Sequence, residues 1–437
     1  METWAGFCTR CIINNIVFHF TGDTHKNSSV IKVNSENLLA NGELYFLCNF
    51  KAWRSLLVCS TNCTSILQHF AHTHGATKGN IDEDVAEEQI FEQLMIKSSS
   101  WPVRIQRCLL RKERVCLFLN RGDIISNSIR IAIEYGKTFG KAEPTDKAFT
   151  LKYQPDGQSD LTTQRLCLMM DIAAKMLCLH GHTLSTGDNC SKYMFTSKSE
   201  GLVDKGYEKY VCGVVKNSQS NSKETSLTWE QYIKYKMDQL AELSIHKFIE
   251  KNNVKDCFLR NLASAIAIFE LISVKPSRSV IIENNNLEND RSITNTKGAS
   301  FVLYNTARIA TILTKHNEKV SCGDYPSLPD IKNVDFSQLQ EEEEWELIYN
   351  FIFGYPEMIN NCLKCEPGFH IDPQVICLFL SRLCQKFSVY YRKVKILTEG
   401  GDHLIPKRVA RLYMLRALQI VFENALDILG IKPVSRM

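Results

Sequence analysis

The last thirty residues, Arg408 to Met437, read RVARLYMLRALQIVFENALDILGIKPVSRM. Apolar side chains recur three and four positions apart, at Leu415, Leu418, Phe422, Leu426 and Leu429. This spacing predicts a long helix over residues 407–429 with one apolar face. Gly430 stands where a left-handed C-terminal cap is favoured, and Pro433 prevents the helix from resuming. The chain therefore ends in a helix built to pack within a helical domain.

The start of this helix is basic, because Lys407, Arg408 and Arg411 fall in its first turns. Cations at this end oppose the helix dipole, whose positive end favours an anion. The cluster is better explained by a phosphate that binds beside the free backbone N–H groups. A solvated basic face is the alternative interpretation. The pattern favours contact with a nucleic acid.

Composition is that of an ordinary globular protein. The 437 residues are 44% hydrophobic and 23% charged, with a net charge of +4, which alone indicates no nucleic-acid partner. Residues 374–437, however, carry a local net charge of +7, so the basic end of the chain comes last. The length allows two or three domains. We expect no membrane span and no signal peptide, because no apolar run approaches eighteen residues and no charged segment followed by an apolar one resembles a leader. The cysteine pattern described below favours a cytoplasmic location.

Seventeen cysteines form no obvious framework. Their number is odd and they are scattered, which favours reduced thiols over disulfides. Two Cys-x-x-Cys pairs, Cys8 with Cys11 and Cys362 with Cys365, each supply only two of the four ligands of a structural zinc site. One further group has residue types that suit zinc but a spacing too short for a ββα finger: Cys59, Cys63, His69, His72 and His74. We predict no metal site and leave the role of this group open.

Hydrophobic periodicity predicts an α+β chain with its helices concentrated after residue 226. Strands are expected at residues 12–20, 115–120, 148–153 and 210–216. Helices are expected at residues 87–96, 124–140, 161–179, 229–250, 258–271, 300–315, 345–353, 373–391 and 407–429. Linkers are expected at residues 280–297 and 317–338. Asp372 before Pro373 predicts a helix N-cap with proline in the first helical position.

Short patterns follow one another in the second half of the chain. They are Tyr304-Asn305-Thr306-Ala307-Arg308-Ile309, Glu366-Pro367, Leu380, Phe387 and Tyr391, Ala410-Arg411-Leu412, Ala425-Leu426, Leu429-Gly430-Ile431 and the final Met437. In this order they resemble the DALR anticodon-binding domain of arginyl-tRNA synthetases. Upstream, Gly213 is similar to a glycine in the strand before that family's second catalytic signature. Leu117–Leu119 followed by Tyr135-Gly136 resembles the end of the family's N-terminal tRNA-binding domain.

The catalytic signatures of that family are missing. Arg165, Asp171 and Gly181 match residues that follow the family's His-x-Gly-His motif at the same spacings. The motif's own positions are then Asp160-Leu161-Thr162-Thr163, without histidine or glycine. The second, lysine-rich loop falls at residues 217–225, where Lys223 is the only lysine. A neutral hydroxyl cannot replace a cationic imidazole that stabilises a phosphoryl transition state. We therefore expect no aminoacylation, no catalytic residues and no cofactor.

The resemblance implies three parts. These are an N-terminal α/β tRNA-docking domain (residues 1–140), a reduced Rossmann-like middle domain (141–228) and an all-α DALR anticodon-binding helical bundle (229–437). The combination of a DALR domain with missing signatures resembles non-catalytic relatives of the synthetase. That resemblance implies an adaptor that binds particular arginine tRNAs and presents them to a tRNA 3-methylcytidine methyltransferase. A divergent arginyl-tRNA synthetase and a helical interaction scaffold without RNA binding are the alternatives.

The helix at residues 300–315 predicts an RNA-facing surface. Val302, Thr306 and Ile309 share the core face, whereas Phe301, Tyr304 and Arg308 lie on the other side. Rings that stack on bases, beside a guanidinium that binds phosphate, suit splayed anticodon bases. Packing against a neighbouring helix is the alternative. The remaining candidates come from the resemblance and from the basic end of the chain; they are Asn305, Tyr390, Tyr391, Arg392, Lys407, Arg408, Arg411 and Met437.

Overall fold

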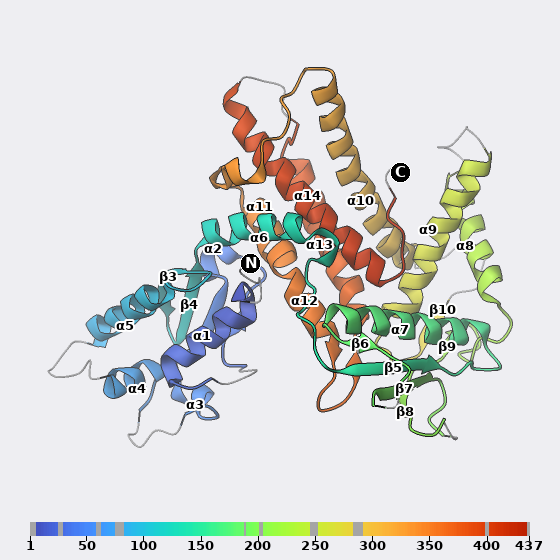
Figure 1. The fold of residues 1–437 in the computed structure, drawn as a ribbon, viewed down its shortest axis with the longest axis horizontal. Helices are drawn as coiled ribbons and strands as arrows, with labels where there is room; N and C mark the ends of the chain where they lie inside the picture. The colour runs from blue at the N-terminus through green and yellow to red at the C-terminus, as the bar shows by residue number, and fades with distance from the viewer. Residues whose placement is uncertain are drawn as a thin grey trace. The chain divides into compact units, whose positions relative to one another are not determined.

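The computed structural model describes residues 6–24, 29–57, 63–74, 83–187, 189–200, 204–244, 252–282, 292–397 and 402–434. The chain forms two compact units (Figure 1). Unit 1 comprises residues 1–131 and 332–357, and unit 2 comprises residues 132–331 and 358–437. The reduced Rossmann-like part thus shares a compact unit with most of the helical part. The three-part division, which follows family likeness, stays a prediction.

Unit 1 is built on an antiparallel sheet in the order β1-β2-β4-β3. Its strands are β1 (Lys32–Val33), β2 (Leu44–Leu47), β3 (Ile105–Arg111) and β4 (Arg114–Leu119). Its helices are α1 (Thr9–Thr21), α2 (Leu38–Asn41), α3 (Phe50–Trp53), α4 (Ile66–Thr73), α5 (Glu83–Ser98), the start of α6 (Arg121–Tyr135), α11 (Glu342–Leu347) and the π-helix Ile348–Phe353. The core contains edge-to-face contacts of the Phe20 ring with Phe46, Trp53 and Phe70.

The predicted strand at residues 12–20 is wrong, because this segment is helix α1. Its buried residues Ile12, Ile16, Val17 and Phe20 follow helical spacing and line one face. Their β-branched character favoured a strand in the sequence. Burial of a helical stripe against the sheet outweighs that local preference.

A buried carboxylate attaches the segment 332–357 to the sheet of unit 1. Glu43 is almost fully buried and accepts hydrogen bonds from the Leu119 N–H at 2.8 Å and the Trp345 indole N–H at 3.0 Å. The Tyr349 hydroxyl donates to the Glu43 carbonyl at 3.2 Å. Burial raises the pKa of Glu43 above its ordinary value, although these donors and Arg121 oppose the shift. The predicted helix at residues 345–353 is thereby anchored in unit 1.

Unit 2 contains a parallel sheet in the order β6-β5-β7-β8, a Rossmann-like arrangement. Its strands are β5 (Ala148–Tyr153), β6 (Thr183–Leu184), β7 (Ser191–Thr196) and β8 (Glu208–Val211), and α7 (Asp160–Leu179) packs on them. The predicted strand at residues 210–216 is split into β8 and β9 (Val215–Asn217), and β9 pairs with β10 (Val280–Ile282) instead. Gly213 lies at the break, where a Cβ would stand 2.3 Å from the Arg278 carbonyl group.

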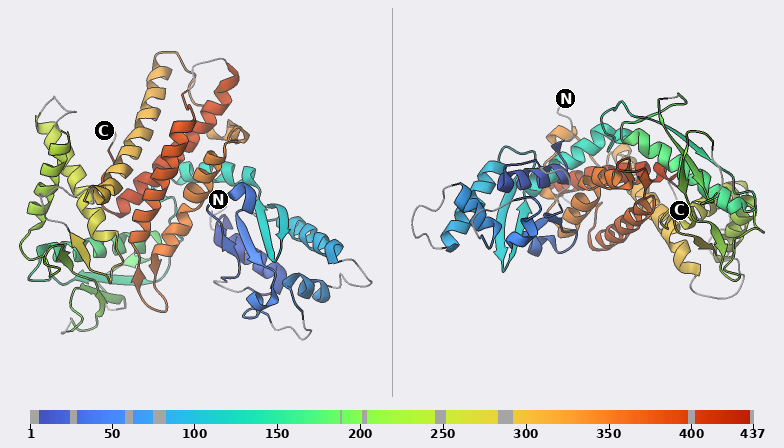
Figure 2. Two further views of the ribbon diagram at one scale, coloured as in Figure 1. Left: turned by 180° about the vertical axis from the view of Figure 1, so that it is seen from behind. Right: turned by 90° about the horizontal axis from the view of Figure 1, so that it is seen from below.

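Long helices make up the rest of unit 2. They are α8 (Trp229–Ser244), α9 (Asn252–Ile272), α10 (Ser292–Ser321), α12 (Tyr355–Cys362, which begins in unit 1), α13 (Gln374–Lys393) and α14 (Ile405–Ile428), with a small hairpin of β11 (Leu363–Lys364) and β12 (His370–Ile371). Helices α10, α13 and α14 pack against one another (Figure 2). None of the helices described is long and apolar enough to span a membrane.

Helix α14 confirms two predictions, the burial of the regularly spaced apolar residues and the left-handed cap at Gly430. Leu415, Leu418 and Phe422 are fully buried, and Gly430 is left-handed with φ +72°. The prediction that Asp372 is the N-cap of α13 is wrong, because Pro373 occupies the N-cap position and no side-chain capping hydrogen bond forms there. The predicted linkers at 280–297 and 317–338 are partly wrong as well, since β10 and both ends of α10 occupy parts of them.

Candidate nucleic-acid interface

Helix α10 has the two faces that the sequence predicts. Val302, Thr306 and Ile309 are buried. Tyr304 is 44% exposed, and Arg308 is partly exposed one helical turn further on. The aromatic and cationic side of α10 is therefore available for a ligand.

A groove separates α10 from the end of α13 and has a volume of about 610 Å³. Its charged and aromatic lining residues are Tyr304, Arg308, Lys315, Tyr391, Arg392, Lys393 and Lys395. Five of these are cations, and none of the described residues that line the groove is a carboxylate. We call this cavity the cationic groove. Its charge and its two tyrosines match the requirements of single-stranded RNA, whose phosphates need cations and whose bases stack on rings.

Arg308 lies between the two tyrosines of the cationic groove. Its guanidinium carbon is 4.5 Å from the Tyr304 ring centroid and 4.3 Å from that of Tyr391. Its Nη2 also donates to the Tyr304 hydroxyl at 2.7 Å. Within the described residues Arg308 forms no ion pair, so its charge is not neutralised by a carboxylate. Stacking on two rings holds the guanidinium in place before any ligand binds.

The wall of the groove that the sequence did not identify comes from residues 394–397. Helix α13 ends at Lys393, and Val394 continues with an extended backbone at φ −113° and ψ 122°. This places the Lys395 side chain along the groove. Lys393 and Lys395 belong to the basic end of the chain, residues 374–437. The sequence around them does not indicate which cations of this segment share a cavity with α10.

Several predicted contact residues prove to be buried supports. Asn305 is fully buried; its Nδ2 donates to the Phe301 carbonyl at 2.8 Å and its Oδ1 accepts from Ser388 at 3.0 Å, which joins α10 to α13. Tyr390 is also fully buried. Because the side chains of Asn305 and Tyr390 are both buried, neither can contact RNA directly. Phe301 is half-buried, and Arg392 lines the groove.

The basic first turns of α14 are likewise less open than the sequence suggested. Arg408 is 5% exposed and covers the Tyr325 ring, with its guanidinium carbon 3.8 Å from the centroid. Arg411 is 7% exposed and donates to the Lys395 carbonyl at 3.2 Å. Arg411 thus positions the groove wall rather than a phosphate. Lys407 is half-buried, and Met437 lies outside the described residues.

The remnant of the nucleotide site is filled by internal contacts. Thr162 occupies a position of the missing His-x-Gly-His motif, is fully buried, and accepts a hydrogen bond from the Val215 N–H at 3.1 Å. Arg165 is fully buried and donates to the carbonyls of Leu271, Lys275, Gly213 and Arg278. Burial lowers the pKa of Arg165 to about 10. These side chains hold neighbouring loops together.

Lys223, the single lysine of the second signature loop, is held by Asp156. Its ammonium lies 3.0 Å from both carboxylate oxygens. Asp156 also accepts from the Ser159 N–H just before α7, where a nucleotide phosphate would need free N–H groups. Burial alone would raise the pKa of Asp156, but hydrogen bonds from Ser197 and Lys223 outweigh it and lower the pKa. A carboxylate thus occupies the helix end that a phosphate would use.

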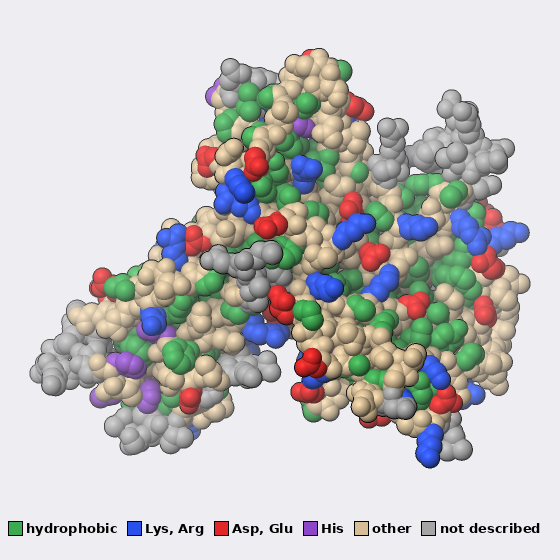
Figure 3. Space-filling view, in the orientation of Figure 1, with side chains coloured by type: hydrophobic (Ala, Val, Ile, Leu, Met, Phe, Trp, Pro, Cys, Tyr) green, Lys and Arg blue, Asp and Glu red, His purple; other side chains and the backbone are tan. Residues whose placement is uncertain are grey.

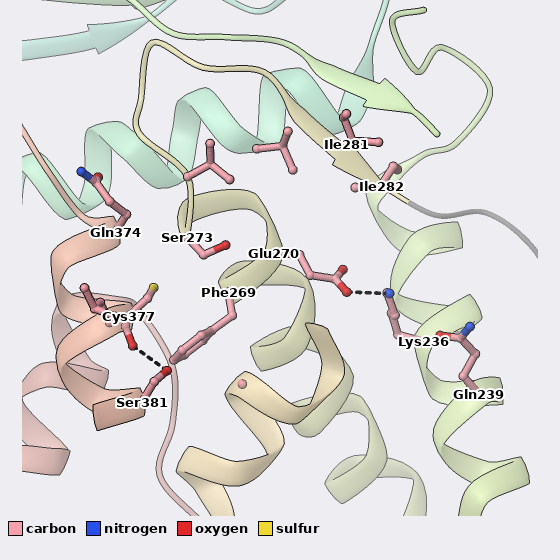
Figure 4. Close-up of a pocket in the computed structure, with 14 residues that line it drawn as sticks. Lys236, Gln239, Phe269, Glu270, Ser273, Ile281, Ile282, Gln374, Cys377 and Ser381 are labelled. Carbon is pink, nitrogen blue, oxygen red and sulfur yellow. Dashed lines mark hydrogen bonds and ion pairs between the residues drawn. The ribbon is translucent and has the colours of Figure 1, made fainter. Parts of the chain in front are cut away.

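A second cavity, of about 380 Å³, lies among α8, α9, β10 and α13 (Figure 4). Its cation is already paired, because the Lys236 ammonium is 2.8 Å from the Glu270 carboxylate and both side chains are largely buried. The Tyr232 hydroxyl donates to the other carboxylate oxygen of Glu270. This ion pair stabilises the contact between α8 and α9, and its charge is not available to RNA.

Histidine side chains gather on the face of unit 1 around α4 (Figure 3). Among the described residues no group of three or more His, Cys, Asp or Glu side chains is arranged to hold a metal ion. His69 is buried against the Phe50 ring, with 5.3 Å between ring centroids. Cys59 lies outside the described residues, so the role of the predicted cluster stays open.

Comparison with known proteins supports the likeness seen in the sequence. Residues 302–437 match the family described as DALR anticodon binding domain. The chain is 32% identical over 234 residues to the mouse protein named DALR anticodon-binding domain-containing protein 3, and this region covers 52% of this chain and 42% of the mouse protein. The zebrafish protein of the same name is 30% identical over 237 residues, covering 52% of this chain and 41% of that protein. The matched region thus spans less than half the length of these relatives.

The likeness extends to arginyl-tRNA synthetases. Arginine–tRNA ligase of Saccharolobus solfataricus is 27% identical over 177 residues, covering 40% of this chain and 25% of the ligase. The structure resembles arginyl-tRNA synthetase of Thermus thermophilus with a TM-score of 0.64 and 9% identity, covering 98% of this chain and 100% of that chain. The Plasmodium falciparum enzyme gives 0.62 and 8%, with the same coverage. At such low identities these structures show the fold. Together with the family match over residues 302–437, they confirm the predicted mixture of helices and sheets with a C-terminal DALR helical domain.

Proposed function

We propose that this chain is a non-catalytic tRNA-binding adaptor. It recognises arginine tRNAs through its DALR domain and presents them to a tRNA 3-methylcytidine methyltransferase. The observation that carries the RNA-binding proposal is Arg308, stacked between Tyr304 and Tyr391 in a groove whose described lining residues include five cations. The relatives support the tRNA class, because they are named for an anticodon-binding domain or for arginine–tRNA ligation.

The groove suits an unpaired RNA segment better than a duplex. Tyr304 and Tyr391 are 44% and 40% exposed, so each ring offers surface to an unstacked base. Unpaired loops can splay their bases onto such rings, whereas paired bases are already stacked. The cations on both sides of the rings would bind the connecting phosphates without reading sequence. An anticodon loop meets both requirements.

The first experiment compares Arg308→Glu with Lys234→Glu, a matched control. Lys234 is an exposed lysine of α8. Binding of a labelled arginine tRNA to the full chain would be measured at fixed salt. Loss of a guanidinium that contacts bases and phosphate is expected to weaken binding by about 10- to 100-fold in Arg308→Glu. The control should change binding less than about threefold, because one distant charge contributes little at moderate salt. Equal losses in both variants would contradict a groove-specific contact.

Absence of catalysis is supported by the contacts at the remnant nucleotide site. No imidazole stands at residues 160–163, and Lys223 is committed to Asp156. A synthetase with arginine would exchange pyrophosphate into ATP, so this assay tests the alternative directly. We expect no exchange above background. Exchange that depends on arginine would establish the divergent synthetase instead.

Presentation to the methyltransferase requires a separate test. Methylation of an arginine tRNA by the purified methyltransferase would be measured in three reactions: with the wild-type chain, with the Arg308→Glu variant, and with neither form of the chain. The proposal expects stimulation by the wild-type chain only. Sequencing of RNA bound to the wild-type chain tests the tRNA class independently. A bound pool without enrichment of arginine tRNAs would contradict the adaptor function.

A further inference from the structure

Two cysteines meet at the first turn of α1. Cys8 is the N-cap residue of the helix, with an extended backbone, and Cys11 follows within the first turn. Their Sγ atoms are 3.4 Å apart and share a hydrogen bond from one thiol to the other sulfur. A disulfide bond is about 2.05 Å long, so the two sulfurs need to approach by little more than an ångström. The spacing and the distance together favour a pair that can close.

The hydrogen bond between the two thiols favours ionisation of one of them while the other keeps its proton. The hydrogen bond with Cys11 lowers the pKa of Cys8 to about 7, although burial acts in the opposite direction. The same hydrogen bond raises the pKa of Cys11. A thiolate at the N-terminal end of α1 is further favoured by the helix dipole. The thiolate is the reactive form of cysteine, and both the hydrogen bond and the helix end favour that form at Cys8.

We propose that Cys8 and Cys11 form a reactive dithiol that undergoes exchange with small disulfides of the oxidised glutathione class. The Cys8 thiolate attacks one sulfur of the small disulfide, which forms a mixed disulfide and releases one thiolate. Cys11 then loses its proton, and its sulfur attacks Cys8 and releases the second thiolate. The dithiol loses two electrons, and the small disulfide gains them and two protons. The reverse exchange with the reduced thiol restores both cysteines.

The other Cys-x-x-Cys pair provides a natural control within the chain. Cys362 is 2% exposed and Cys8 is 9% exposed, so both first cysteines are buried. The Cys362 Sγ lies 3.6 Å from the Met358 sulfur, whereas the Cys365 Sγ lies 3.7 Å from the His182 Nε2. Burial raises the pKa of Cys362 to about 12 and also raises that of Cys365. The two pairs share a spacing, but the structure joins the sulfurs only in the first. Sequence spacing alone therefore does not explain the proposed reactivity.

The dithiol lies where the two segments of unit 1 meet. The Phe7 ring contacts the Phe353 ring edge-on, with 5.1 Å between centroids. Arg10 Nη2 is 3.4 Å from a Glu357 carboxylate oxygen. Oxidation would therefore occur beside the contact between α1 and the segment 332–357. This chemistry is independent of RNA binding by unit 2.

The test uses the reduced full-length chain and oxidised glutathione at neutral pH. After quenching with iodoacetamide, trypsin cleaves at Arg10, between the two cysteines, and at Lys26, and it also cleaves at Lys364. A Cys8–Cys11 disulfide thus appears in mass spectrometry as a linked pair of peptides, residues 1–10 and 11–26. We expect this pair to form at least about 100-fold faster than the link between Cys362 and Cys365, because the first two sulfurs already lie in contact and the thiolate is favoured at Cys8 but disfavoured by burial at Cys362. Reduced glutathione should remove it.

Two variants identify the roles of the cysteines. Cys11→Ser should stop after the first exchange and retain glutathione on Cys8, whereas Cys8→Ser should form neither the adduct nor the link. The wild-type comparison alone also decides the question, so the proposal does not depend on the folding of a variant. A linked pair that forms no faster than the Cys362–Cys365 link, or not at all, would overturn it.

Discussion

Unit 2 contains two places where cations gather, and they differ in what already neutralises them. In the remnant nucleotide site, Arg165 donates to four backbone carbonyls and Lys223 pairs with the buried Asp156. In the cationic groove, Arg308 stacks on two tyrosines and forms no ion pair with any described residue. Arg165 and Lys223 thus stabilise the fold through internal partners. The cations of the groove face a cavity.

This difference decides which site can bind an anion. A phosphate that bound Lys223 would have to displace a buried carboxylate, which would then lose its charge partner in a poorly solvated place. A phosphate in the groove would meet Arg308 beside its two rings and leave the cation–π contacts intact. Residue type and local charge are similar at the two places. Burial and existing partners separate a structural cation from one that binds a ligand.

Removal of Arg165 should have the largest effect on stability. Arg165→Met leaves buried carbonyls without donors, and each unsatisfied group is costly. We expect the free energy of unfolding to fall by about 3–5 kcal/mol, a typical cost for breaking a buried charged network. Chemical denaturation of the full chain would measure it. The matched control is Arg382→Met on α13, where the side chain is exposed, and it should change stability by less than about 0.5 kcal/mol.

Lys223→Met should destabilise the chain in a pH-dependent manner. The lowered pKa of Asp156 means that its ion pair contributes stability above its ordinary titration range, and that this contribution is lost as the pH falls into that range and below. We expect a loss of about 2 kcal/mol at pH 7, because an unpaired buried carboxylate remains. Denaturation at a series of pH values should show wild type and variant converging toward pH 3. A gap that stays constant with pH would contradict the ion-pair explanation.

The elements that the sequence predicted well are those with a long, unambiguous period. Strand β5 matches its predicted bounds, and α7 and α14 begin or end within two residues of theirs. In α14 the apolar spacing identified residues that are indeed buried, because a helix that packs against others must bury such a stripe, but residues 408–415 are buried on all sides of the helix. The location of the family's first catalytic motif at residues 160–163 rests on the resemblance of Arg165, Asp171 and Gly181 to the residues that follow it, and stays a prediction.

The members of the site could be predicted only in part. Tyr304, Arg308 and Tyr391 meet in the groove, but Asn305, Tyr390, Arg408 and Arg411 turn out to be buried behind it. Helical periodicity tells which residues share a face, yet not which face a neighbouring helix will cover. A buried arginine also looks the same in sequence as an exposed one, because the partner that allows its burial, such as the Tyr325 ring or the Lys395 carbonyl, is distant in the chain.

Tyr391→Leu tests the stacking half of the cationic groove. It removes a ring that Arg308 and a base would share but retains an apolar side chain, so folding should be little affected. We expect tRNA affinity to fall by about 1–2 kcal/mol, or roughly 5- to 30-fold, the usual effect of losing one base–aromatic stack. Binding titrations at several salt concentrations would measure it. The slope of log affinity against log salt should remain unchanged, because no cation is lost.

Lys395→Gln tests the electrostatic half and should have the smallest effect on affinity. Its ammonium lines the groove, whereas the contact with Arg411 uses its backbone carbonyl and survives the substitution. Loss of one phosphate contact should reduce the slope of log affinity against log salt by about 0.7, the value for one counterion on single-stranded RNA. The same titrations measure it, with Lys234→Gln as the control that leaves the slope unchanged. If the slope of log affinity against log salt changed in Tyr391→Leu but not in Lys395→Gln, the roles assigned to these two residues would be contradicted. The phosphates would then contact cations other than those of the groove wall.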